Sequence, residues 1–367
     1  MLILVFIFSA LVSWFACPSI FKLLEQLKIY DIPKQRSVHR CKILRMGGFI
    51  FITGFLTAAI MLPLVKNQGT QDDWFKLIGI ILGAFFIALL GGLDDYFDLR
   101  ARTKFLYQWI IAGVVCGFGV QVTEFKIFGM GSELGVLSIP FTMFWIVGVS
   151  NAVNLLDGLD GLAAGTAMIV CIFLVFLGSG NLGMAFLLTG LMGGLTAFLR
   201  YNSHPAKVFM GDVGSLFLGY CLAVGSIELL PWKESFAGFV LPILVLALPI
   251  GDTLWAIGRR LLEGKPPFSP DKNHIHHRLI ASGLGHRQAT ACLYLMSISA
   301  GLLVALLAYA SIEVVACIVG ANGLLFLMFS LPLTKQQRVQ QIHFLKAYKS
   351  VKMPTAPQKN ELILKAR

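Results

Sequence analysis

The sequence predicts an all-α protein, a polytopic membrane bundle of about eleven transmembrane helices. Of its 367 residues, 57% are hydrophobic and 13% are charged, and its mean hydropathy is +0.78. Soluble domains carry roughly 25% charged residues, so the deficit excludes an ordinary soluble domain. Apolar runs of about 20 residues recur along the chain, which is the length that a helix needs to cross a bilayer. Such runs are about twice as long as the strands of a membrane barrel.

The first apolar run, residues 2–21, is expected to be a retained helix, because no basic segment precedes it as in a signal peptide. Residues 22–45, which follow it, contain seven Lys or Arg. Basic loops stay in the cytoplasm, so the N-terminus is expected outside. The expected spans cover residues 2–21, 46–65, 75–92, 105–122, 139–156, 161–178, 182–199, 213–230, 237–257, 289–310 and 313–333.

The distribution of charge favours an odd number of spans and a cytoplasmic C-terminus. Of 30 Lys and Arg residues, only Lys66, Lys76, Lys126 and Lys233 fall in outer loops under this topology. One span more or fewer would mix the inner and outer sets. Residues 1–333 are therefore expected to form an integral membrane domain, and residues 334–367 a basic cytoplasmic tail near anionic lipid.

Composition also argues against two other kinds of site. The net charge of +11 is explained by basic cytoplasmic loops, so no nucleic-acid partner is expected. The seven cysteines are scattered, mostly in apolar runs, and form no CxxC pair. They are interpreted as small buried residues rather than as disulfides or zinc ligands.

The segment 94–98, Asp-Asp-Tyr-Phe-Asp, brings three carboxylates to the end of an apolar run. Neighbouring carboxylates repel unless a cation or a proton lies between them. This pattern indicates a divalent-metal site that holds a phosphorylated substrate. A solvated helix end is an equal alternative for this segment alone. Basic residues follow, Lys104 among them, so a metal and a phosphate can be held side by side.

Two more polar segments interrupt the apolar pattern. Residues 151–162 carry Asn151, Asn154, Asp157 and Asp160, with a helix break expected at Gly158. Polar groups near a membrane are costly and usually functional; a capped turn explains Asp160 but not the other three together. Residues 209–215, Phe-Met-Gly-Asp-Val-Gly-Ser, open a span. The Asp or the Ser of this segment can cap the helix, or the N-terminus of the helix can bind an anion, and both interpretations stay open.

The remaining two segments are basic. Residues 37–48 place Arg45 and other cations beside a Gly pair, which suits an anionic substrate, although an ordinary cytoplasmic loop also explains them. Residues 267–279 carry three His with an Arg. Zinc is disfavoured because no Cys accompanies them and cations lie nearby, so phosphate contacts fit better. Asp252 is a separate intramembrane acid, expected to pair with Arg259 or Arg260.

Together these five segments, in order over residues 37–279, resemble the polyprenyl-phosphate N-acetylhexosamine-1-phosphate transferases of the glycosyltransferase 4/MraY-like superfamily. The His-Ile-His-His run at 274–277 resembles most the bacterial WecA type, which uses UDP-GlcNAc. The His-His-His run of the peptidoglycan enzymes is absent. Relatives often have Pro before the Arg or Gly pair, where this chain has Ile43-Leu44-Arg45, so the first loop departs from the pattern.

The resemblance implies a role for each matching residue. Asp212 matches the ligand of Mg²⁺, with Mn²⁺ as an alternative ion, and the acidic pair Asp94 and Asp95 lies beside that metal. Phe209 matches a residue that stacks on uracil, and the His loop closes over the pyrophosphate and sugar. The implied catalytic residues are Asp94, Asp95, Asp157, His276 and His277. The implied substrate-binding residues are Arg45, Lys104, Asn154, Asp160, Phe209, His274 and Arg278.

The implied reaction is attack of undecaprenyl phosphate on the sugar-linked phosphorus of UDP-GlcNAc, which gives undecaprenyl-diphosphate-GlcNAc and UMP. This is the first membrane step of O-antigen or common-antigen type polysaccharide synthesis. The expected location is the bacterial cytoplasmic (inner) membrane, with the active site facing the cytoplasm; membrane lipid and a second copy, as a homodimer, are further partners. Alternatives are another UDP-N-acetylhexosamine such as UDP-QuiNAc or UDP-FucNAc, a teichoic-acid role, or a transporter or flippase of a lipid-linked anionic solute.

Overall fold

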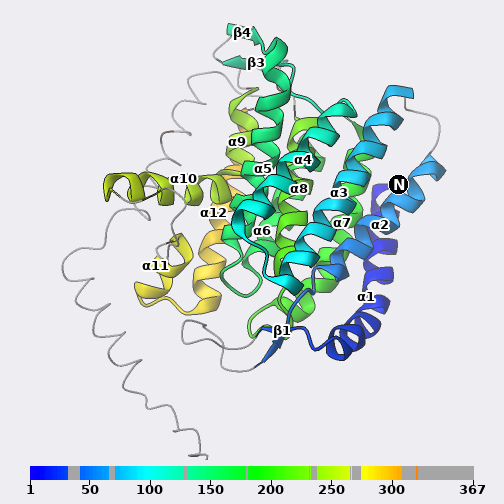
Figure 1. The fold of residues 1–367 in the computed structure, drawn as a ribbon, viewed down its shortest axis with the longest axis vertical. Coiled ribbons are helices and arrows are strands. Elements are labelled where there is room, and N and C mark those ends of the chain that lie inside the picture. Colours follow the sequence, from blue (N-terminus) through cyan, green and yellow to red (C-terminus); the bar gives the residue numbers. More distant parts are fainter. Residues whose placement is uncertain are drawn as a thin grey trace, which may run out of the picture.

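The computed structural model describes residues 1–31, 42–65, 71–127, 130–178, 181–230, 238–264 and 274–307, with the single residues 232, 266 and 320. These residues form a bundle of long helices with two small hairpins (Figure 1). The expected span at 313–333 and the expected tail at 334–367 lie outside the described residues.

The elements follow one another in chain order with short connections. They are α1 (Leu2–Gln26), β1 (Tyr30–Asp31), β2 (Ile43–Leu44), α2 (Phe49–Met61), η1 (Leu62–Val65), α3 (Gln71–Phe97), α4 (Ala101–Gly117), β3 (Glu124–Ile127), β4 (Met130–Glu133), η2 (Gly135–Leu137), α5 (Ser138–Leu156), α6 (Leu162–Leu177), α7 (Leu182–Asn202), α8 (Gly211–Leu229), α9 (Val240–Val245), α10 (Ala247–Leu262), α11 (Ile275–Ala281) and α12 (His286–Leu307).

The chain is a multi-pass helical membrane protein. Six helical segments of the described residues are long and apolar enough to cross a membrane: Leu2–Gln26, Asp73–Phe97, Gly135–Leu156, Leu182–Asn202, Gly211–Leu229 and His286–Leu307. Two shorter apolar helices cover Phe49–Leu64 and Leu162–Leu177. The two expected spans on either side of residues 178–182 are separate helices, α6 and α7, as predicted.

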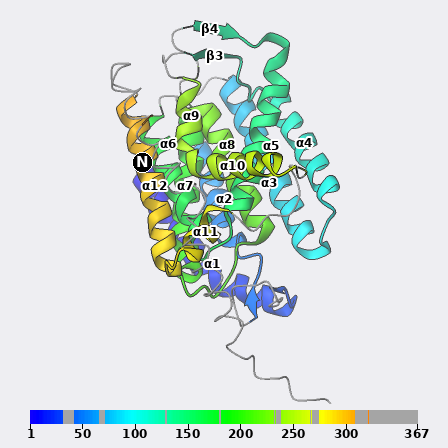
Figure 2. The ribbon, with the colours of Figure 1, turned by 90° about the vertical axis from the view of Figure 1, so that its left-hand side faces the viewer.

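The expectation of one continuous span over residues 237–257 is wrong. The structure divides it into the short helix α9 and the separate helix α10, which runs crosswise to the bundle axis (Figures 1 and 2). Pro249 explains the break, because its ring would clash with the carbonyl of Val245 in a continuous helix. α10 is amphipathic: Leu254 and Leu262 are exposed, whereas Asp252 is buried.

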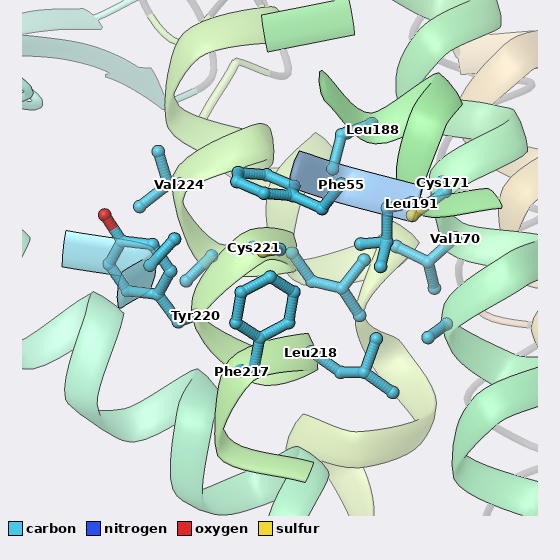
Figure 3. Packing of buried hydrophobic residues seen from close by; sticks show 14 of the residues in the cluster. Phe55, Val170, Cys171, Leu188, Leu191, Phe217, Leu218, Tyr220, Cys221 and Val224 are labelled. Carbon is cyan, nitrogen blue, oxygen red and sulfur yellow. The ribbon is translucent and has the colours of Figure 1, made fainter. Parts of the chain in front are cut away.

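Helix α8 lies at the centre of the core and is buried along almost its whole length. Phe217 and Tyr220 of α8 pack with Phe55 of α2 and Leu188 of α7 (Figure 3). The Tyr220 hydroxyl donates a hydrogen bond of 3.0 Å to the backbone carbonyl of Ile80, which joins α8 to α3. The core therefore fixes the axis and depth of α8, and with it the position of its N-terminus.

The two ends of the bundle differ. The β3–β4 hairpin lies at one end, and β1, β2 and α11 lie toward the other (Figure 1). The C-terminal ends of α3 and α5 and the N-terminal end of α8 also lie at this second end. Residues that are far apart in the sequence therefore meet there.

Candidate active site

The N-terminus of α8 is held by a carboxylate from another helix. Asp95, near the end of α3, accepts hydrogen bonds of 2.9 Å from the backbone N–H groups of Asp212 and Val213. Its side chain is completely buried. An acid at a helix N-terminus satisfies unpaired N–H groups and complements the helix dipole. Asp95 thus caps α8 from a position 117 residues earlier in the chain.

The close approach of α3 and α8 requires glycine. A Cβ at Gly91 would collide with the backbone of Asp212 and Val213. Gly211 has a φ of +72°, and a Cβ there would collide with the Asp95 carboxylate. The glycines in the two motifs therefore let two backbones touch, which brings the acids of both motifs into one site.

Arg45 completes the environment of Asp95. Its Nε lies 2.8 Å from Oδ1 of Asp95. The segment that carries Arg45 is joined to the connection before α8, because Gly47 N–H donates to the Phe209 carbonyl at 2.8 Å and Phe209 N–H donates to the Leu44 carbonyl at 2.8 Å. Arg45 and Phe209, two residues predicted to bind substrate, therefore lie on adjacent segments that are hydrogen-bonded to each other.

Asp94 contacts Lys104 rather than the groups that Asp95 contacts. Nζ of Lys104 lies 2.8 Å from Oδ2 of Asp94 and 2.9 Å from Oδ2 of Asp212. Oδ1 of Asp94 accepts a hydrogen bond from Leu99 N–H at 3.0 Å. One ammonium group thus bridges two carboxylates from α3 and α8. Successive residues on a helix are rotated by about 100°, which explains how Asp94 and Asp95 face different groups.

Asn154 orients the second of these carboxylates. Its amide nitrogen donates to Oδ1 of Asp212 at 2.9 Å and to Oγ of Ser215 at 2.7 Å. Both amide hydrogens are used, so the orientation of the Asn154 side chain is fixed. Ser215 was not predicted as a site residue; its only sequence signal is its position three residues after Asp212.

The break between α5 and α6 lies beside this cluster. α5 ends at Leu156, and Asp157 follows as its half-buried C-terminal neighbour. Burial, together with the charges of Asp212 and Asp95, raises the pKa of Asp157 to about 7. Asp157 is therefore close to half-protonated at neutral pH, as expected of a carboxyl group held near two other acids.

Asp160 lies in the same turn and contacts the connection between α7 and α8. Its Oδ2 lies 2.7 Å from Nδ1 of His204 and accepts a hydrogen bond from Ala206 N–H at 3.1 Å. The His204 ring stacks on His286, with ring centroids 4.9 Å apart and an interplanar angle of 24°. Asp160 thus joins the α5–α6 turn to the connection between α7 and α8 and to the start of α12.

The His segment packs onto this turn from the side. His276 is buried, and a Cβ added to Gly158 would overlap its imidazole ring. The His274 and His276 rings are parallel, 5.9 Å apart, and His277 lies 4.2 Å from His276. Burial, with the charge of His277, lowers the pKa of His276 to about 3. His276 is therefore a neutral imidazole at physiological pH.

Burial likewise lowers the pKa of Arg278, which is half-buried in α11. The expected pairing of Asp252 with Arg259 or Arg260 stays a prediction. Asp252 contacts His274, through Nδ1 at 2.9 Å, and accepts a hydrogen bond from Ile275 N–H at 2.8 Å. Sequence spacing gave no signal for this pair, because 22 residues separate the two side chains.

The acidic cluster fits a divalent cation. Asp94 and Asp212 aim one oxygen each at the same point, where the Lys104 ammonium lies. Mg²⁺ is bound by few carboxylate oxygens and keeps several waters, so two carboxylates are enough. Both oxygens of Asp95 already accept hydrogen bonds from fixed donors. Its predicted role as a ligand stays a prediction, and its contacts are those of a group that positions α8.

A second group of possible ligands comprises Asp160, His204 and His286, whose ligand atoms lie within 4.8 Å of one another. Two imidazoles favour a transition metal over Mg²⁺. The stacked rings do not suit one ion, because ring-nitrogen lone pairs lie in the ring planes and parallel planes do not converge. We therefore interpret this group as a structural contact between α12 and the two connections.

Comparison with known proteins agrees with the motifs. Residues 77–230 match the sequence profile of glycosyl transferase family 4. The chain is 38% identical over 299 residues to a probable undecaprenyl-phosphate N-acetylglucosaminyl 1-phosphate transferase of Bacillus subtilis (strain 168), which covers 80% of this chain and 82% of that protein.

Two further relatives differ in their named substrates. The chain is 35% identical over 322 residues to the decaprenyl-phosphate N-acetylglucosaminephosphotransferase of Mycobacterium leprae (strain TN), which covers 80% of each protein. It is 36% identical over 274 residues to a phospho-N-acetylmuramoyl-pentapeptide-transferase of Caldanaerobacter subterraneus, which covers 70% of this chain and 81% of that protein. Each of these relatives covers at least 70% of this chain, and the family profile spans the acidic cluster. On this similarity the chain belongs to glycosyl transferase family 4, as its five motifs predicted.

Proposed function

We propose that this protein transfers GlcNAc-1-phosphate from UDP-GlcNAc to undecaprenyl phosphate, with release of UMP. The observation that carries the proposal is the pair of carboxylates, Asp94 and Asp212, that share one cation position beside Lys104. Phosphoryl transfer requires charge neutralisation and alignment of the phosphates more than covalent chemistry. The GlcNAc-1-phosphate transferases named among the relatives support the choice of sugar and acceptor.

Mg²⁺ is the proposed ion, held by Asp94 and Asp212, and when bound it would neutralise charge on the pyrophosphate. The two carboxylates converge on the Lys104 ammonium, so Lys104 would have to give up these contacts for the carboxylates to hold an ion. Its ammonium group would then be available as a donor to a phosphate oxygen. Asn154 keeps Asp212 oriented throughout, because both of its amide hydrogens stay engaged.

The acceptor needs little activation. The second pKa of a phosphate monoester is about 6, so the lipid phosphate is mostly a dianion at neutral pH and can attack phosphorus directly. We therefore propose a single displacement, with no aspartyl-phosphate intermediate. Asp157, His276 and His277 are proposed to contact the reacting groups, and Phe209, Asp160, His274 and Arg278 to bind the nucleotide sugar.

We infer that this site faces the cytoplasm of a bacterial inner membrane. The support is charge: 30 Lys and Arg residues fall almost entirely in loops of one side, and basic loops remain in the cytoplasm. With this orientation the N-terminus lies outside, residues 1–333 form the membrane domain, and residues 334–367 form a basic cytoplasmic tail. Residues 237–257 form α9 and the crosswise α10 in place of one straight span.

The experiment is a membrane assay with a panel of UDP-sugars. Membranes that contain the protein should convert UDP-GlcNAc and undecaprenyl phosphate to the lipid diphosphate sugar, with one UMP released for each product. UDP-MurNAc-pentapeptide should not react, because the His-Ile-His-His segment differs from the His-His-His run of the peptidoglycan enzymes. Preference for UDP-QuiNAc or UDP-FucNAc would keep the reaction and change the sugar. Uptake of a lipid-linked solute without UMP release would favour a transporter.

A further inference from the structure

Helix α10 carries a buried acid that reaches the His segment. Asp252 is 3% exposed, although α10 runs crosswise to the bundle and exposes Leu254 and Leu262 on its other face. One carboxylate oxygen accepts a hydrogen bond of 2.8 Å from Ile275 N–H, and the other lies 2.9 Å from Nδ1 of His274. Figures 1 and 2 show α11 between α10 and the end of the bundle that carries β1.

The first of these contacts caps α11. Ile275 is the first residue of this seven-residue helix. So short a helix has few internal hydrogen bonds, and its first N–H groups need partners from outside. Apolar contacts support the same docking, because Ile275 and Leu279 lie in one buried cluster with Leu248 of α10 and Leu293 of α12. The position of α11 is thus set by apolar contacts with α10 and α12 and by the hydrogen bond from its first N–H group to Asp252 of α10.

The second contact fixes the tautomer and the ring orientation of His274. A carboxylate only accepts hydrogen bonds, so Nδ1 of His274 must carry the hydrogen that it donates. The other ring nitrogen, Nε2, is then left for a different partner. The His274 side chain is almost fully buried, so the contact with Asp252 takes place away from water and holds the ring in one orientation.

The position of α11 also determines how His276 lies against the α5–α6 turn. The His276 ring lies parallel to His274 and is 2% exposed. It also lies where a side chain at Gly158 would be, directly after Asp157. A change in the docking of α11 therefore moves His276 relative to the turn that carries Asp157.

We propose that Asp252 is a positioning residue for the transfer reaction: it docks α11 on α10 and fixes the His274 ring, so that the His segment is held against the Asp157–Gly158 turn. The inference rests on the proposed function. Asp252 itself contacts no substrate; it acts through His274. A purely structural role for Asp252 predicts a loss of protein without a specific dependence on His274, which separates the two possibilities.

The test is a double-mutant cycle on the full-length protein in membranes. Asp252→Asn keeps the shape of the side chain and one oxygen for Ile275 N–H, but its amide group cannot accept from Nδ1 of His274 in the same way. His274→Asn keeps a donor near the place of Nδ1 and removes the rest of the ring. Thr253→Val, at the neighbouring position of α10, is the matched control, because the Thr253 hydroxyl has no hydrogen-bond partner among the described residues.

The readout is UMP release, with kcat and KM for UDP-GlcNAc measured separately. We expect Asp252→Asn to lower kcat at least tenfold in the wild-type background and less than twofold in the His274→Asn background. The Thr253→Val protein should match the wild type. Coupled residues show this non-additivity, whereas independent ones do not. Amount and monodispersity of the purified protein are measured for each variant.

Two results would overturn the inference: turnover within twofold of wild type for Asp252→Asn, or an equal loss in both backgrounds. If the Asn variant is not recovered as folded protein, Asp252→Glu replaces it in the same cycle, and the same dependence on His274 is required. A wild-type protein that releases no UMP from any UDP-sugar contradicts the proposed function instead, so the two failures are distinguishable.

Discussion

Replacement of Asp95 by Asn is expected to destabilise the protein rather than only to weaken metal binding. The buried carboxylate accepts hydrogen bonds from two backbone N–H groups at the start of α8 and pairs with Arg45. Asn keeps one acceptor oxygen, while its amide group faces donors that it cannot satisfy. The Arg45 side chain is 36% exposed, so water screens the ion pair, and the cost of the substitution comes mainly from the two backbone hydrogen bonds.

Of the two charge-assisted hydrogen bonds, one is lost and the other loses its charge. A hydrogen bond to a charged group contributes about 1.5–3 kcal/mol, so the substitution should cost about 2–4 kcal/mol. A loss of this size should lower the unfolding temperature on the order of 10 °C. Asp98→Asn is the matched control: Asp98 belongs to the same motif, is exposed, and has a φ of +53° that Asn tolerates. It should change the stability by less than about 0.5 kcal/mol.

The assay is thermal unfolding of the purified protein in one detergent and lipid mixture, together with the Mg²⁺ concentration that gives half-maximal turnover. Asp95→Asn should unfold well below both the wild type and Asp98→Asn. If Asp95→Asn unfolds at the temperature of the control but needs much more Mg²⁺, then Asp95 is a metal ligand and its role as a helix cap carries little energy.

Three further outcomes test other parts of the site. Asp212→Asn should need at least tenfold more Mg²⁺ for half-maximal turnover. It should lower the unfolding temperature less than Asp95→Asn does, because Lys104 keeps Asp94 as a partner and no backbone N–H group of the described residues loses its acceptor; normal turnover at low Mg²⁺ would contradict its role as a ligand. Between pH 6.5 and pH 3 the imidazole of His276 binds a proton in the unfolded protein but not in the folded protein, where its pKa is about 3. The free energy of unfolding of the wild type should therefore fall by about 1.4 kcal/mol more per pH unit in this range than that of His276→Gln. Parallel pH curves for the two proteins would contradict the burial of His276. A Cys at exposed Ser282, in a protein without native Cys, should resist an impermeant thiol reagent in intact cells, whereas labelling from outside would reverse the proposed orientation; the loop position Ser269 lies outside the described residues.

Much of the bundle was predictable because lipid imposes a simple rule on sequence. Apolar runs of spanning length must be helices, and α3, α7 and α8 lie close to their expected positions. The crosswise α10 was missed because hydropathy measures the length of an apolar run and not its direction. Pro249 was the one local sign of a break, and a proline is also tolerated near the start of a helix.

The sequence predicted which residues belong to the site, but it did not predict which of them contact one another. Asp94, Lys104, Asn154 and Asp212 were each singled out as polar groups at the ends of apolar runs, and the structure brings them together. Which acid faces which donor depends on the rotation of α3 against α8, which adjacency in sequence does not reveal. The contact between Asp252 and His274 depends on how α10 bends back over the bundle.

The acids of the site divide according to whether their donors can move. Asp95 is paired with two backbone N–H groups and with Arg45, and Asp252 is paired with a helix N-terminus and a buried ring. Backbone donors cannot leave without unfolding, so these two acids are committed to holding α8 and α11. Asp94 and Asp212 each keep one oxygen on a fixed donor, Leu99 N–H or the Asn154 amide. Their other oxygens share the ammonium of Lys104, which lies at the end of a flexible stem. A divalent ion and a pyrophosphate can bind to these carboxylates only if the donor that occupies them can move away. We therefore expect the ion and the reacting phosphates to bind at Asp94 and Asp212. Asp95 and Asp252 are expected to hold the helices that position this site.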